Sequence, residues 1–156
     1  MRLAPILLAA LIFGASFVAT SVLPLSAAEF GTRDEAIAMV RRVQEKFRKD
    51  GPDATFKAIN NKAFVDRDLF PWVYRLSDGT NMANALVPAV RGKELIDLKD
   101  QDGKYLIREM IHIAGGPGFG WVNYKWPNPI NNKIEDKTSY VEKMGDYFVG
   151  VGVYRE

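Results

Sequence analysis

The sequence contains no cysteine and a single histidine, His112, among its 156 residues. Without cysteine the chain cannot form disulfides, a thiolate nucleophile, zinc fingers or cysteine-ligated iron–sulfur clusters. The charges nearly balance, with 21 Lys and Arg against 19 Asp and Glu, so the basic surface that binds nucleic acid is not expected. Hydrophobic residues make up 47% of the chain, which is a globular composition, and the length suits one domain.

Motifs for catalysis and for metal binding are also scarce. His112 falls on a predicted helix beside Arg108, which favours a surface histidine over a catalytic base. The glycine-rich segment 115–120 follows a helix and precedes a strand, the reverse of a nucleotide-binding loop. The acidic segment 100–109 resembles the later part of a calcium loop, but Leu98 occupies the first ligand position. We therefore expect no catalytic residue, metal or cofactor, and no enzyme activity.

The first segment is typical of an export signal. Met1-Arg2 is a positive start, residues 3–25 carry no charge, and Ser26-Ala27-Ala28 places small residues before a cleavage site. We expect residues 1–28 to be a secretory signal peptide and residues 29–156 to form one domain, periplasmic or secreted. The apolar run is also long enough to remain as an uncleaved membrane anchor.

Helical patterns come first in the remaining chain. Thr32 and Glu35 form a capping-box pair ahead of apolar residues at helical spacing, which are Ala36, Val40, Val43 and Phe47. Asp50-Gly51-Pro52 ends this helix, and Asp53 begins a shorter one that buries Phe56 and Ile59.

From Phe64 onward the apolar pattern has a period of two. It predicts strands over residues 70–76, 81–86, 118–126, 137–144 and 147–154, with a connecting helix over 103–114 that Asp102 caps. In the last strand Gly150 and Gly152 share one face, where another group is expected to approach the backbone closely. The fold class is therefore α+β: an antiparallel sheet of five to six strands with a long amino-terminal helix and a short connecting helix.

Large amphipathic side chains and cations gather on the predicted sheet. The aromatic residues are Trp72, Tyr74, Trp121, Tyr124, Trp126, Tyr140 and Tyr147, and the cations are Arg75, Lys125 and Lys137. Apolar walls with a few fixed polar groups suit a small-molecule pocket. An ordinary core whose tyrosine and tryptophan tips reach solvent explains the same residues, so the pattern leaves both interpretations open.

The order of these segments resembles the single Cache domain of type 2, an extracytoplasmic sensor module with a PAS-like sheet. The resemblance covers about residues 32–154 and is carried by Phe64-Val65-Asp66-Arg67-Asp68, Trp72-Val73-Tyr74, Asp78-Gly79, Asp100-Gln101-Asp102-Gly103-Lys104, Gly120-Trp121-Val122-Asn123-Tyr124-Lys125-Trp126-Pro127-Asn128-Pro129, Lys137-Thr138-Ser139-Tyr140-Val141 and Gly150-Val151-Gly152-Val153-Tyr154.

This resemblance implies ligand binding without turnover. The ligand contacts that it implies are Tyr124, Trp126, Lys137 and Tyr140, with Trp72 and Tyr74 as walls, and Lys137 would hold the carboxylate of a small organic acid. Asn84 stands where the family often has a His-Pro pair; it keeps hydrogen-bonding capacity but cannot be protonated.

Because the sequence ends at Glu156 without an output domain, we expect a free exported protein that binds a small molecule and acts through a membrane sensor partner. The alternative is a periplasmic protein-interaction module without a small ligand. An intact pocket rimmed by Lys137, Tyr124 and Tyr140 favours the first, whereas a pocket filled by Trp72, Trp121 or Trp126 beside an exposed apolar patch favours the second.

Overall fold

The computed structural model describes residues 30–154, so the predicted signal peptide, residues 1–28, lies outside the described residues. The elements are helix α1 (Arg33–Asn60), strands β1 (Pro71–Arg75) and β2 (Asn81–Asn84), the 3-10 turn η1 (Pro88–Val90), helix α2 (Leu106–Gly115), and strands β3 (Phe119–Pro127), β4 (Ile134–Met144) and β5 (Tyr147–Val153). This confirms the predicted α+β fold. Among the described residues, no helix combines the length and apolar character needed to cross a membrane.

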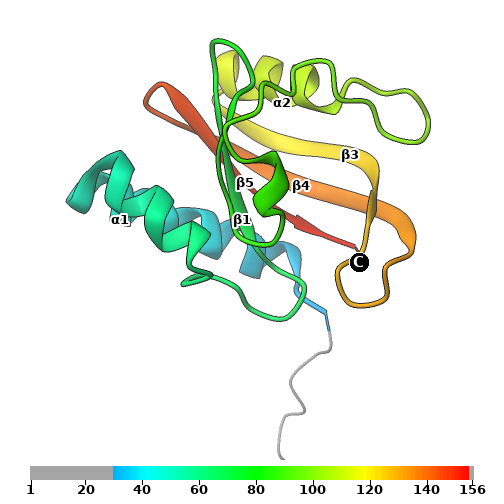
Figure 1. The fold of residues 1–156 in the computed structure, drawn as a ribbon, viewed down its shortest axis with the longest axis horizontal. Helices are drawn as coiled ribbons and strands as arrows, with labels where there is room; N and C mark the ends of the chain where they lie inside the picture. Colours follow the sequence, from blue (N-terminus) through cyan, green and yellow to red (C-terminus); the bar gives the residue numbers. More distant parts are fainter. Residues whose placement is uncertain (1–29, 155–156) are drawn as a thin grey trace, which may run out of the picture.

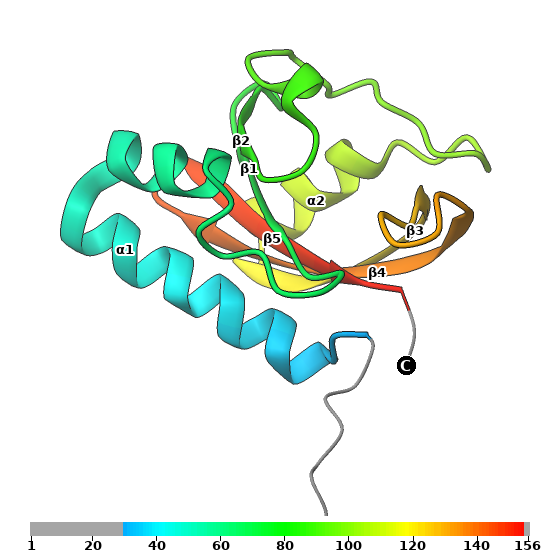
Figure 2. The same cartoon turned by 60° about the horizontal axis from the view of Figure 1, so that its bottom comes forward.

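The strands form one antiparallel sheet in the order β2-β1-β5-β4-β3 (Figure 1). Helix α1 lies against one face of this sheet, and α2 with the long connection from β2 covers the other (Figure 2). The connection also covers both sheet edges: Lys93 and Gly92 bond to the backbone of Asn81 on β2, while Asp100 and Lys104 bond to the backbone of β3. These contacts occupy some of the backbone groups at each edge that could otherwise pair with another chain.

Helix α1 begins and bends where the sequence predicts. The Thr32 hydroxyl accepts a hydrogen bond from the Glu35 N–H, and the Glu35 carboxylate accepts one from the Thr32 N–H, which completes the capping box. At Gly51, φ is 80° and ψ is 176°, a conformation outside the helical region, so the helix kinks before Pro52. The two predicted helices are the two arms of α1, and Phe56 and Ile59 are buried as expected.

The predicted start of α2 is wrong. Its first residue is Leu106, and the residue before it, Tyr105, makes no capping bond through its side chain. Gly103 has a φ of 82°, so the chain turns after Asp102 and the helix begins farther along. Asp100 organises this turn instead, because its carboxylate accepts hydrogen bonds from the N–H groups of Asp102, Lys104 and Lys125.

The sheet face toward α2 has two close approaches at glycines. Gly150 pairs with Trp72 and Gly152 with Ser139 across the neighbouring strands. A Cβ at Gly150 would lie 2.1 Å from the Trp72 ring, and one at Gly152 would lie 2.1 Å from the Lys137 Cε. The expected close approach at these glycines is confirmed, and it allows Trp72 and Lys137 to lie flat across β5.

Candidate ligand-binding site

A small cavity lies between the α2 side of the sheet and α2 itself. Its volume is about 30 Å³, and its lining residues are Phe70, Trp72, Tyr74, Asn84, Val87, Leu106, Ile107, Met110, Tyr124, Trp126 and Lys137. Strand β1 contributes Trp72 and Tyr74, β3 contributes Tyr124 and Trp126, and Lys137 lies directly opposite Tyr124 on β4. The structure therefore brings together six of the seven residues singled out as ligand contacts.

Lys137 is the charged group of this cavity and is only 2% exposed. Its Nζ donates a hydrogen bond to the Tyr154 hydroxyl at 3.0 Å and lies 4.4 Å from the ring centres of both Phe70 and Tyr154. None of the ion pairs within residues 30–154 involves Lys137. Burial therefore lowers the pKa of Lys137 to about 7, although the nearby Asp68 carboxylate acts in the opposite direction.

Three tyrosine hydroxyls lie at or beside the site as neutral hydrogen-bonding groups: Tyr74 and Tyr124 line the cavity, and Tyr154 accepts from Lys137. The Tyr124 hydroxyl lies 2.7 Å from the Ser139 Oγ, and the Tyr154 hydroxyl donates to the Pro127 carbonyl at 2.7 Å. Burial raises the pKa of Tyr74 to about 12 and also raises the pKa values of Tyr124 and Tyr154. These phenols therefore stay protonated at physiological pH.

Aromatic and aliphatic groups form the remaining walls. Trp72 meets Tyr74 edge-on, with ring centres 5.4 Å apart, and Tyr74 stacks on Phe148 at 5.7 Å. Leu106 and Met110 of α2 close the opposite side. The Asn84 Oδ1 accepts hydrogen bonds from the N–H groups of Leu86 and Val87. The side-chain oxygen of Asn84 is therefore occupied by the loop, and only its side-chain N–H groups remain to donate to the cavity.

Tyr140 lies on the other face of the sheet, away from the cavity. Its ring contacts Trp121, with centres 5.4 Å apart, and its hydroxyl donates to the Glu142 carboxylate. Successive strand residues alternate between faces, so Lys137 and Tyr140, three positions apart on β4, point in opposite directions.

The other predicted cations are paired at the surface. Arg75 forms an ion pair with Asp78 at 2.9 Å, and Lys125 forms one with Asp136 at 2.8 Å. Lys125 and Asp136 also line a larger open cleft of about 660 Å³ beside β3, which shares Tyr124 and Lys137 with the small cavity. Because Lys125 is already paired and accessible to solvent, the small cavity is the stronger candidate for a specific site. No cluster of metal-binding side chains occurs in the part of the chain that the structure describes.

Sequence reasoning missed two aromatic residues that contact the lysine. Phe70 has the same strand parity as Trp72 and Tyr74, and Tyr154 continues the parity of Gly150 and Gly152. Extending each period-two pattern by one step would have found both. His112, by contrast, is exposed in the last turn of α2, as predicted.

Comparison with models of known protein families shows which family this chain belongs to. The family model dCache_2, described as a Cache domain, matches residues 34–156. The chain belongs to the Cache domain family. The match confirms the Cache part of the resemblance, whereas the assignment to the single, type 2 subgroup stays a prediction.

Two curated relatives share sequence with this Cache chain. The sensor histidine kinase MctS of Rhizobium johnstonii is 31% identical over 123 residues, which are 76% of this chain and 26% of the kinase. The methyl-accepting chemotaxis protein McpP of Pseudomonas putida is 33% identical over 91 residues, which are 57% of this chain and 16% of McpP. The chain thus spans about a quarter of MctS and less of McpP.

Solved structures show the same Cache fold. A methyl-accepting chemotaxis protein from Vibrio parahaemolyticus superposes with a TM-score of 0.62 at 26% identity, covering 78% of this chain and 86% of that chain. A Cache chemosensory domain, whose structure was described as the basis for carboxylic acid recognition, also gives a TM-score of 0.62, at 24% identity. It covers 79% of this chain and 88% of that chain, and at this identity it supports the fold alone.

Proposed function

We propose that this Cache domain binds a small monocarboxylate in the cavity beside Lys137 and acts as a sensor rather than as an enzyme. The observation that carries the proposal is the buried Lys137 ammonium, which is 2% exposed and takes part in none of the ion pairs of residues 30–154. A buried cation without an ion pair is costly. The electrostatic influence of Asp68 offsets part of this cost, and a bound carboxylate would offset more of it.

The surrounding donors suit the second requirement of a bound carboxylate, which is hydrogen bonding to both oxygens. The Tyr124 hydroxyl and the Ser139 Oγ share one hydrogen bond in which either atom can donate. One O–H of this pair is therefore free to turn toward a ligand oxygen. Together with the Lys137 ammonium it forms a charge-assisted site for an anion. The Asn84 amide adds N–H donors from β2.

The cavity size limits the ligand to the smallest organic acids. A cavity needs roughly 10–15 Å³ of this volume to hold one water, so the present volume of about 30 Å³ accepts only a few heavy atoms. The lining also includes Trp72, Leu106 and Met110, which favour a short apolar tail over a second charged group. Acetate, with four heavy atoms, comes nearest to both conditions, and propionate is one heavy atom larger.

Isothermal titration calorimetry at pH 6 tests the proposal with matched ligands. We expect acetate or propionate to bind, acetamide to bind at least about tenfold more weakly because it lacks the charge, and hexanoate to be excluded by size. The variant Lys137→Met should lose the affinity, whereas Lys125→Met removes a surface cation and should leave it unchanged. Absence of carboxylate binding by the folded wild type, or binding by Lys137→Met at wild-type affinity, would overturn the proposal.

We also propose that the protein is a single Cache domain of type 2 that is exported and transmits its ligand-bound state to a membrane sensor. Residues 30–154 hold one sheet and one buried lysine, and residues 3–25 carry no charge, as in an export signal. Mass spectrometry of the protein from the periplasmic fraction should find an amino terminus at Glu29. An intact Met1 terminus on a membrane-bound protein would instead show a retained anchor.

A further inference from the structure

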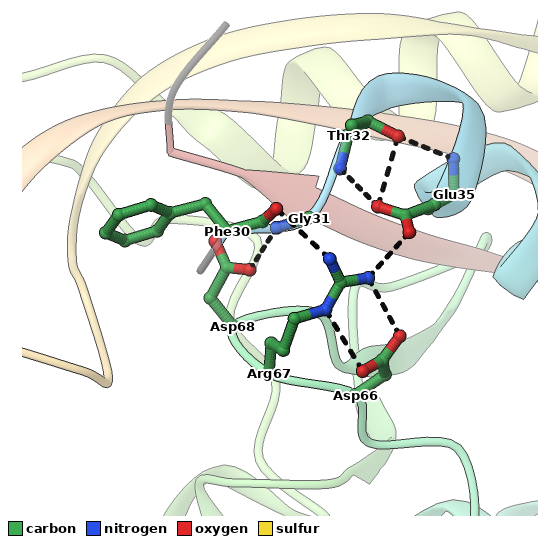
Figure 3. Close-up of polar contacts among 7 residues, drawn as sticks. All are labelled: Phe30, Gly31, Thr32, Glu35, Asp66, Arg67 and Asp68. Carbon is green, nitrogen blue, oxygen red and sulfur yellow. Dashed lines mark hydrogen bonds and ion pairs between the residues drawn. The ribbon is translucent and has the colours of Figure 1, made fainter. Parts of the chain in front are cut away.

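The loop between α1 and β1 contacts both the cavity and the start of α1. On the cavity side, the Phe70 ring lies under the Lys137 Nζ, and the charge of Asp68 acts on the same ammonium. On the other side, the Asp68 Oδ1 accepts a hydrogen bond of 2.7 Å from the Gly31 N–H, at the point where the chain enters α1 (Figure 3). The Asp68 carboxylate thus accepts a hydrogen bond from Gly31 and acts electrostatically on Lys137, two residues that lie far apart in the sequence.

Asp68 is in an unusual position for a carboxylate. It is fully buried, and its Oδ2 has no hydrogen-bond partner among the described residues. Its charge is therefore stabilised by one N–H group and by the electrostatic influence of Lys137. A buried ion with so few partners responds strongly to any change in the charge beside it.

The loop itself holds Asp68 in place. The Asp66 N–H donates to the Leu69 carbonyl at 3.0 Å, and the Leu69 N–H donates to the Asp66 carbonyl at 2.8 Å. On the outer side of the loop, Arg67 donates to the Phe30 carbonyl and to the carboxylates of Glu35 and Asp66 (Figure 3). These outer contacts also hold the start of α1, but they lie at the surface, where solvent screens them from the cavity.

We propose that Asp68 couples the cavity to the chain that enters α1, so that an anion bound at Lys137 weakens the hold of Asp68 on Gly31. The inference rests on the proposed carboxylate site. A bound anion satisfies Lys137 and repels Asp68, which makes the buried, closed arrangement of Asp68 less favourable. Detachment of Gly31 lets water reach the Asp68 carboxylate, so the open arrangement gains relative to the closed one. Asp68 is thus a positioning residue that acts through Lys137.

Reciprocity makes the coupling measurable from both ends. If a bound anion repels Asp68, then removal of the Asp68 charge removes this repulsion and should strengthen anion binding at a pH where Lys137 is charged. The neutral variant Asp68→Asn keeps an oxygen that accepts from Gly31 and removes only the charge. A residue with a merely structural role would lower the affinity or leave it unchanged when it is replaced.

Amide hydrogen exchange of the wild-type protein, with and without saturating acetate, tests whether a bound anion weakens the Asp68–Gly31 contact. We expect acetate to slow exchange in the core strands β1 and β5 and to accelerate exchange at Gly31. Slower exchange in the core with unchanged or slower exchange at Gly31 would overturn the coupling while leaving the carboxylate site intact. No change in the core would instead count against the site itself.

Calorimetry at pH 6 tests whether removal of the Asp68 charge strengthens anion binding. We expect Asp68→Asn to bind acetate about fivefold more tightly than the wild type, the lower range of allosteric coupling. Asp66→Asn is the matched control, since it removes one negative charge from the same loop on its outer side. Equal or weaker binding by a folded Asp68→Asn protein, or equal tightening by both variants, would overturn the proposal.

Discussion

At the scale of single residues, Lys137 combines two properties that rarely occur together. It is almost fully buried, and its nearest polar partner is the neutral hydroxyl of Tyr154. A lysine at the surface is charged over the whole physiological range, whereas burial lowers the pKa of Lys137 to about 7. The charge that would bind a carboxylate is therefore itself sensitive to pH near neutrality.

The affinity for acetate should consequently fall as the pH rises. The charged lysine pairs with the anion and the neutral lysine does not, so affinity is constant below about pH 7 and then decreases by up to about tenfold per pH unit. The titratable groups that act on or contact Lys137 are Asp68, Tyr124 and Tyr154. Burial raises the pKa values of Tyr124 and Tyr154, so these two tyrosines do not titrate in this range. Calorimetry at pH 6, 7, 8 and 9 checks this. A constant affinity over that range would show that Lys137 keeps an ordinary pKa or does not bind the anion.

Gly152 is the residue that allows Lys137 to occupy its position. A Cβ there would lie 2.1 Å from the Lys137 Cε and 2.4 Å from the Ser139 Oγ. We expect Gly152→Ala to displace both side chains, to cost about 1–3 kcal/mol of unfolding free energy, and to weaken acetate binding about tenfold. Gly115→Ala is the control, because nothing lies within 4 Å of its added Cβ. Denaturant unfolding and calorimetry measure the two effects, and wild-type behaviour of Gly152→Ala would contradict the close approach.

At the scale of elements, local patterns predicted the structure well where the cause is local. The Thr32–Glu35 capping box and the kink at Gly51 depend on neighbouring residues, and both occur where expected. Contacts between distant segments were harder to predict. Strand β4 begins at Ile134, earlier than predicted, because it continues to pair with Pro127 at the end of β3. Likewise, Asp100 binds Lys125 of β3, a contact that the turn sequence alone does not reveal.

The candidate site shows the same difference between features with a local cause and contacts between distant segments. Strand periodicity places Trp72 with Tyr74 and Tyr124 with Trp126, and the structure lines the cavity with all four. Tyr140 was included through family resemblance, although its spacing from Lys137 already implies opposite faces of one strand. Asp68 received no role because its two partners, Gly31 and Lys137, lie far from it in the sequence.

The kink in α1 supplies a prediction at this scale. At Gly51 the φ of 80° with ψ of 176° falls in a region that essentially only glycine adopts, although an added Cβ would meet no atom within 4 Å. We expect Gly51→Ala to lower the unfolding free energy by about 1–3 kcal/mol through backbone strain alone. Acetate affinity should not change, because α1 lies on the opposite face from the cavity. The exposed neighbour Lys49→Ala should stay within about 0.5 kcal/mol of the wild type, and equal stabilities of the two variants in denaturant unfolding would refute the strain.

At the scale of the whole molecule, stability and binding make opposite demands on the core. The chain has no cysteine, so packing on the two faces of one sheet must hold it together. A core selected for stability alone would place an apolar side chain at position 137. The proposed carboxylate site would give this buried lysine a role, and the cost of keeping it should appear as a lower unfolding free energy of the unliganded protein.

That cost has a defined sign and pH range. The pKa of Lys137 is about 7 in the folded protein and about 10.4 in an unfolded chain. Between these values the unfolded state binds more protons, so the unfolding free energy of the unliganded protein should rise with pH, by up to about 1.4 kcal/mol per unit. Lys137→Met removes the titrating group and should remove this rise. Urea unfolding of both proteins at pH 7, 8 and 9 measures the difference, which isolates Lys137 from other groups. Parallel pH profiles for the two proteins would mean that the lysine is solvated in the folded state. Saturating acetate should flatten the wild-type profile, because the bound anion restores the charged form of Lys137.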